Sequence, residues 1–140
     1  MFYDCYRLSS TPVLSTTILA NWCYSNMFHG CSSLITPLDL PATTLANSCY
    51  YRMFSGCTAL STPPNLPAKR LTPYCYQQMF AGCTNLTDAP SLSAKDLTLS
   101  CYYEMFNGCS KLSSIEVDFT DWDSEEDATT NWVSGVAVNG

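Results

Sequence analysis

The sequence has a single histidine, only six lysine and arginine residues together, and no long uninterrupted apolar run. A bilayer-spanning helix needs about 18 or more consecutive apolar residues, so no segment is predicted to cross a membrane. The basic residues are too few for the positive surface that nucleic acid binding requires. Residues 1–7 also lack the basic start and apolar core of a secretory signal. Any export signal is therefore expected upstream of residue 1.

Basic residues are absent from the end of the chain, residues 115–140, which hold seven acidic residues. Residues 1–114 hold five acidic and six basic residues and are almost neutral. The formal net charge of −6 is thus concentrated in the tail. With 140 residues, of which 46% are hydrophobic, the chain is long and apolar enough to form one folded domain.

A repeat of 26 residues organises the chain. Met-Phe pairs occur at 1–2, 27–28, 53–54, 79–80 and 105–106. The cysteine columns are Cys5, Cys31, Cys57, Cys83 and Cys109, and Cys23, Cys49, Cys75 and Cys101. The leucine columns are Leu8, Leu34, Leu60, Leu86 and Leu112; Leu14, Leu40, Leu66 and Leu92; and Leu19, Leu45, Leu71 and Leu97. This period lies within the leucine-rich-repeat range of about 20–29 residues. Since Met1 stands at a repeat position, the array is expected to begin partway through a unit.

Each unit is predicted to contain one helix and one short strand. Leu45, Cys49, Met53 and Cys57 lie four residues apart, which predicts a helical stripe ended by Gly56. The proline-rich residues 60–67 predict a short extended segment. Neither element can bury its apolar face alone, so units are predicted to stack with parallel strands on one side. The predicted fold class is α/β, a leucine-rich-repeat solenoid over residues 1–114, followed by an acidic cap or tail segment over 115–140.

Residues 50–60 read Tyr-Tyr-Arg-Met-Phe-Ser-Gly-Cys-Thr-Ala-Leu, and Leu66-Pro67 follow. This pattern recurs through 1–114 and resembles the BspA-like leucine-rich repeats, which carry an aromatic-Cys-x-x-Leu signature and a Leu-Pro strand. Residues 127–136 are similar to the segment that often follows the last repeat in that family. The resemblance implies a secreted or cell-surface bacterial protein involved in adhesion to host or matrix components.

The nine cysteines suggest a metal site, disulfides or core thiols. Zinc sites use close pairs such as Cys-x-x-Cys, whereas the spacings here alternate between 8 and 18 residues. Disulfides such as Cys31 to Cys49 or Cys23 to Cys31 stay open for an exported protein, although an odd number leaves one cysteine over. Two cysteines eight residues apart on one helix lie about 12 Å apart, too far to bridge. The columns favour free core thiols, with no metal and no cofactor.

No catalytic constellation is evident, and the protein is predicted not to be an enzyme. His29 lies in a variable column just before the repeat glycine, where we expect it to be exposed. It has no evident partner for general-base catalysis, and no phosphate loop or nucleophile-base pair occurs. The tyrosine side chains of one column are expected to pack between the predicted helices, with their hydroxyls at the rim of the core, and this interpretation is favoured over stacking on a ligand. This column contains Tyr24, Tyr50, Tyr76 and Tyr102.

The acidic run 118–127 has two interpretations. Its carboxylates are the ligands that calcium takes, but the run lacks the glycine and the spacing of a known calcium loop. A solvated face of a cap is favoured, with Phe119, Trp122 and Trp132 supplying apolar contacts. This end of the array is expected to be closed, and residues 1–26 to be frayed or covered by a partner.

Ligand contacts are expected at positions that vary between otherwise identical units, because the ladder positions are committed to the core. The favoured set lies around the predicted strand, since stacked repeats usually bind along their concave sheet. It consists of Asp39, Asn65, Ser91, Thr36, Thr62 and Asp88. A second set on the predicted helix consists of Arg52, Gln78 and Glu104, with Tyr51, Gln77 and Tyr103 beside them.

These features predict a non-catalytic binding or adhesion module that recognises a protein or glycan partner, for example in a host matrix. The alternative is a structural or assembly scaffold, or a spacer, in a larger complex or viral particle. Self-association through the uncapped N-terminal end is a further expectation. An enzyme would require a catalytic domain outside this sequence.

Overall fold

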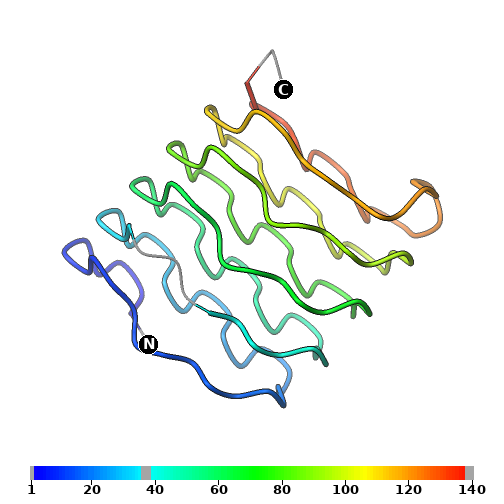
Figure 1. Cartoon of the computed structure of the whole chain (residues 1–140), viewed down its shortest axis with the longest axis horizontal. Helices are drawn as coiled ribbons and strands as arrows, with labels where there is room; N and C mark the ends of the chain where they lie inside the picture. Colours follow the sequence, from blue (N-terminus) through cyan, green and yellow to red (C-terminus); the bar gives the residue numbers. More distant parts are fainter. Residues whose placement is uncertain (1, 36–38, 138–140) are drawn as a thin grey trace.

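The computed structural model describes residues 2–35 and 39–137, which form a stack of coils (Figure 1). One side of every coil consists of consecutive turns, which cover 21–30, 47–56, 73–82, 99–108 and 126–135. We call these segments the turn ribbons. The outer segments, which connect one ribbon to the next, cross the front of the stack in Figure 1. The two chain ends lie at opposite ends of the stack.

The described residues contain no helix and no continuous strand. Two isolated parallel bridges join Ile18 to Thr44 and Leu92 to Val117. The predicted α/β leucine-rich-repeat solenoid, with one strand and one helix per unit, is therefore wrong, and so is the leucine-rich-repeat class that it implied. The 26-residue period of the sequence corresponds instead to one coil of this stack.

Backbone amides in a turn ribbon alternate between two kinds of hydrogen bond. From Cys49 onward, odd-numbered residues of the ribbon 47–56 donate three residues back, as Tyr51 does to the carbonyl of Ser48 at 3.2 Å, and the amide of Asn47 donates to the Oδ1 of Asn21 at 3.1 Å. Even-numbered residues donate to the next coil, as Tyr50 does to the carbonyl of Cys75 at 3.1 Å. Every amide of the ribbon is thus satisfied without the helical pattern of bonds four residues apart.

Every fourth residue of a ribbon has a left-handed backbone conformation. In 47–56 these residues are Ser48 with φ 55°, Arg52 with φ 51° and Gly56 with φ 76°. Such a residue interrupts an α-helix and suits the third position of a type II turn. The conformation is strained for residues other than glycine, so the surrounding inter-coil hydrogen bonds must hold it. A Cβ atom on Gly56 would also lie 3.6 Å from Gly30 of the preceding coil.

The distance between coils explains why ribbons replace helices. Hydrogen-bonded extended backbones lie about 4.8 Å apart, whereas packed helices need about 8–10 Å between their axes. The close spacing lets identical side chains stack directly. The ring of Phe54 lies 5.7 Å from that of Phe28 and 5.8 Å from that of Phe80, at interplanar angles of 11° and 3°.

The core consists of the leucine, cysteine, methionine and phenylalanine columns, as the repeat predicts. In the inner coils these side chains are buried. The tyrosine column is enclosed as well: Tyr50, Tyr76 and Tyr102 are each 1% exposed, so their hydroxyls do not lie at the rim as predicted. All nine cysteines are free thiols, and seven of them are buried. The Sγ of Cys57 donates to the carbonyl of Phe28 at 3.1 Å and thereby ties two coils together.

The outer segments are extended, but they do not pair into a sheet. In residues 61–72, Pro64, Leu66 and Ala68 are buried and the residues between them are exposed, which is the two-residue period of an extended chain. Proline lacks an amide N–H and cannot donate to a ladder. Neighbouring outer segments therefore share few backbone bonds, such as the one from Thr87 to Ser61 at 3.2 Å.

The last coil continues the turn ribbon into the acidic tail. Asp127, Asn131 and Gly135 have φ values of 52°, 53° and 75°, at the same four-residue spacing as in the other ribbons. Gly108 donates to the carbonyl of Ser134 at 2.7 Å, one residue further along the chain than the earlier register. The exposed segment 120–127, which carries most of the acidic residues, accommodates the extra residue.

The first coil is more exposed than the inner coils. Leu8, Leu14 and Leu19 are only partly buried and Cys23 is exposed, whereas their counterparts in the inner coils are buried. We call this surface the N-terminal end face. Residues 2–8 are nevertheless held to the stack, because the amide of Phe2 donates to the carbonyl of Met27 at 2.9 Å.

Candidate functional site

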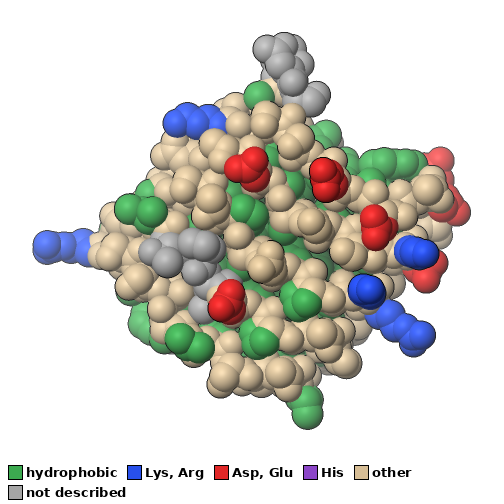
Figure 2. All heavy atoms as spheres, viewed as in Figure 1, with side chains coloured by type: hydrophobic (Ala, Val, Ile, Leu, Met, Phe, Trp, Pro, Cys, Tyr) green, Lys and Arg blue, Asp and Glu red, His purple; other side chains and the backbone are tan. Residues whose placement is uncertain are grey.

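The favoured site residues lie on the outer segments. Five of them are exposed, namely Asp39, Asn65, Ser91, Thr62 and Asp88, and Thr36 lies outside the described residues. Figure 2 shows that this face mixes acidic, neutral polar and hydrophobic side chains. We call it the outer face.

The register between coils decides which of these residues are neighbours. The bond from Thr87 to Ser61 joins residues 26 apart, and the same offset places Thr62 beside Asp88 and Asn65 beside Ser91. The carboxylate of Asp88 accepts a hydrogen bond from the hydroxyl of Thr87 at 2.8 Å. The outer face is thus a set of polar columns one coil apart, and not a concave sheet.

The second predicted set is engaged within the protein. The Nε of Arg52 donates to the Oε1 of Gln78, and the Nε2 of Gln78 donates to the Oε2 of Glu104. The guanidinium carbon of Arg52 also lies 5.2 Å from the ring centre of Tyr51. Arg52, Gln78 and Glu104 all have a left-handed backbone, with φ between 49° and 53°. Their side chains link three coils across the turn ribbons, which leaves them less suited to a ligand than the outer face.

A groove of about 620 Å³ opens at the corner where two coils pass from outer segment to turn ribbon. We call it the corner groove. Its polar residues are Thr43 and Thr44 from one coil and Lys69, Arg70 and Thr72 from the next. Its apolar wall consists of Leu45, Leu71 and Pro67. Pro67 borders the outer face, so the two surfaces are continuous.

The polar residues of the corner groove were not among the predicted site residues. The signal was present in the sequence, because the column of Thr43 continues with Lys69 and Lys95 and varies as much as the favoured positions do. Lys69 and Arg70 are exposed. The hydroxyl oxygen of Thr72 is buried and has no hydrogen-bond partner among the described residues.

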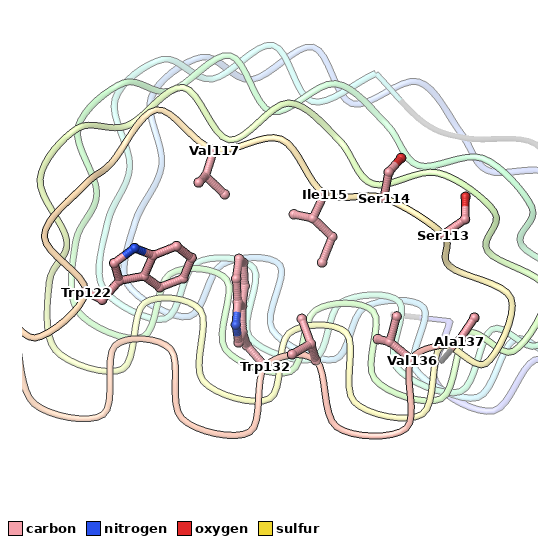
Figure 3. Close-up of a pocket in the computed structure, with 9 residues that line it drawn as sticks. Ser113, Ser114, Ile115, Val117, Trp122, Trp132, Val136 and Ala137 are labelled. Atoms are coloured by element: carbon pink, nitrogen blue, oxygen red, sulfur yellow. The ribbon is translucent and has the colours of Figure 1, made fainter. Parts of the chain in front are cut away.

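A second hollow, of about 520 Å³, lies at the C-terminal end of the stack (Figure 3). Ile115 and Val117 face it from the outer segment, Trp132 from the last ribbon and Val136 from the residue after that ribbon. The ring of Trp122 packs edge-on against that of Trp132 at 5.6 Å and 62°. Trp122 remains 46% exposed, so this end is hollowed and not closed as expected.

The described residues hold no group of three or more histidine, cysteine, aspartate or glutamate side chains arranged for a metal ion. His29 is half-buried and not exposed as expected, and its ring stacks on Tyr3 at 4.9 Å. Its Nδ1 has no hydrogen-bond partner within the described part of the chain. Among residues 2–35 and 39–137, no helix is long and apolar enough to cross a membrane.

The fold and the site define a tandem-repeat protein whose coils are built from stacked turn ribbons. It presents a polar outer face and a basic corner groove. Comparison with protein-family models, curated proteins and solved structures finds no match.

Proposed function

We propose that this chain is a non-catalytic binding module that recognises a protein or glycan partner through its outer face and the adjoining corner groove. One observation carries the proposal. The core columns are nearly invariant from coil to coil, whereas Asp39, Asn65 and Ser91 occupy one exposed column with a different polar residue in each coil. A rigid stack that displays varied hydrogen-bonding groups at a fixed spacing is suited to recognition.

The first test uses the full chain on arrays of glycans and of purified matrix proteins. A ligand found in this way is expected to lose at least about tenfold in affinity to the variant Thr62→Ala/Asn65→Ala/Ser91→Ala, because several hydrogen bonds to it are removed. The matched control Ser33→Ala/Thr84→Ala/Ser110→Ala removes three exposed hydroxyls elsewhere and is expected to bind normally. Equal losses in both variants, or no ligand on either array, would contradict the proposal.

As a second candidate we propose a structural role, in which copies of the chain associate through the N-terminal end face. The partly exposed Leu8, Leu14 and Leu19 and the exposed thiol of Cys23 favour it, because apolar core positions left open to water promote association.

The structural role is tested by sedimentation and thiol labelling over a range of protein concentrations. At high concentration we expect a species larger than a monomer and slower alkylation of Cys23. The buried Cys57, Cys75 and Cys83 serve as internal controls that stay unlabelled throughout. A monomer at every concentration, with a constant rate at Cys23, would rule this role out.

A further inference from the structure

The corner groove is a local concentration of positive charge on a nearly neutral body. Lys69 and Arg70 are consecutive and both exposed. The residues before them in the same columns are the uncharged Thr43 and Thr44, and those after them are Lys95 and Asp96. Figure 2 shows basic and acidic side chains gathered along one edge of the outer face. Two adjacent cations beside a hollow provide charge-assisted hydrogen bonds for a carboxylate or a sulfate.

The remaining surface of the groove is suited to a sugar. The exposed Thr43 and Thr44 contribute hydroxyls, which donate and accept hydrogen bonds as sugar hydroxyls do. Leu45 and Leu71 form an apolar wall for the C–H face of a ring. A volume of about 620 Å³ lies within the range of small-ligand sites.

We infer that the corner groove binds an acidic sugar unit, a uronate or a sulfated sugar, within a glycan that continues onto the outer face. This inference rests on the proposed binding function and names its ligand class. The anionic group lies against Lys69 and Arg70, the ring against the apolar wall, and ring hydroxyls against Thr43 and Thr44. An acidic peptide would use the cations but has no ring to cover the apolar wall.

Acidic side chains limit the number of acidic units that the ligand can place on the protein. Asp121, Asp123 and Glu125 are exposed and belong to the segment 120–127, which turns at the same edge of the stack as residues 67–72 (Figure 1). An anionic chain that followed this edge toward the last coil would meet like charges, which repel it. The outer face also carries the exposed Asp39 and Asp88. Only one or two acidic units, in and beside the groove, are therefore engaged, and the salt dependence of binding is modest.

Titration calorimetry with trigalacturonate, a sulfated trisaccharide, neutral maltotriose and hexaglutamate tests the inference. An acidic trisaccharide is expected to bind at least about tenfold more tightly than maltotriose and hexaglutamate. The first two probes distinguish a carboxylate from a sulfate. The variant Lys69→Gln/Arg70→Gln is expected to lose about tenfold or more in affinity, and Thr43→Val/Thr44→Val a few fold.

The matched control is Arg7→Gln/Lys111→Gln, which changes the net charge equally at two other exposed positions and is expected to bind normally. All variants should keep the unfolding midpoint of the parent, since Thr43, Thr44, Lys69 and Arg70 are exposed. Equal losses in both double variants, or hexaglutamate binding as tightly as the sugars, overturn the inference. If an array ligand depends on the outer face but no acidic sugar binds, the inference fails and the proposed function stands.

Discussion

Alanine in place of Phe80 is expected to lower the free energy of unfolding by about 3–5 kcal/mol. The ring of Phe80 is fully buried and is stacked between two others, with centroids 5.8 Å from both Phe54 and Phe106. The substitution removes both stacking contacts and leaves a cavity that the neighbouring coils cannot close, because their spacing is set by backbone hydrogen bonds. Urea unfolding followed by circular dichroism measures the loss.

The control for this experiment is Phe2→Ala at the open end of the same column. Phe2 is only half-buried and has one ring neighbour, Phe28, at 5.5 Å. We expect its loss to cost less than half as much as that of Phe80. If the two variants unfolded at the same urea concentration, the phenylalanine column would not be the continuous support that the structure describes.

Alkaline conditions are expected to unfold the protein over a narrow range above pH 9. Burial raises the pKa of Cys49 to about 11 and those of Cys57 and Cys109 to about 12, from an ordinary value of 9.0. At a pH between the ordinary and the raised pKa values, the unfolded chain loses thiol protons that the folded chain retains. Stability is therefore unaffected below the ordinary value and falls as the pH rises toward the raised values.

The expected size of the alkaline effect follows from the number of thiols. Each contributes about 1.4 kcal/mol per pH unit, so these three remove roughly 8 kcal/mol by about pH 11. Burial also raises the pKa of Tyr50 and Tyr102, which adds to the loss. Urea midpoints measured with a reducing agent present should be constant near pH 7–8 and fall steeply above pH 9. A midpoint that stayed constant to about pH 11 would contradict the burial of these groups.

The core was predictable from the repeat, but the conformation of the backbone was not. Leu45, Cys49, Met53 and Cys57 lie four apart, which fits a helix over a short stretch and fits a series of four-residue turns over any length. The buried Tyr50 and Phe54 add spacings of three, to Met53 and Cys57, so the full apolar pattern of one unit also fits a helix. Gly56 was interpreted as a helix end, although it is the third left-handed residue of its ribbon.

In the first and last coils, the residue types at the left-handed positions indicate a turn ribbon. The left-handed positions there hold Asn26, Asp127 and Asn131, residue types that tolerate this conformation better than most. In the inner coils the same columns hold Arg52 and Gln78, which carry no such signal. Hydrogen bonds between coils hold their backbone in the left-handed conformation. The conformational preferences of the residues in one unit do not reveal these bonds.

The candidate site was predictable in part. The repeat pattern indicates which residues are exposed, but it does not reveal the shape of the surface that they form. Asn65 and Ser91 were identified as variable and are exposed. The corner groove arises where Thr44 and Arg70 of neighbouring coils lie side by side, which only the coil register establishes. Trp122 and Trp132 were assigned correctly to the end of the stack, but they line a hollow there instead of filling it.

Because the hydrogen bonds between coils connect each ribbon only to its two neighbours, the stack has a distinctive mechanical character. The chain ends lie at opposite ends of the stack, so a pulling force acts first on the outermost coil. That coil can peel away while the rest stays folded, since the coils beneath it keep their own contacts. Each detached coil of 26 residues would lengthen the molecule by roughly 90 Å. Under load the protein would therefore extend in steps of roughly equal length.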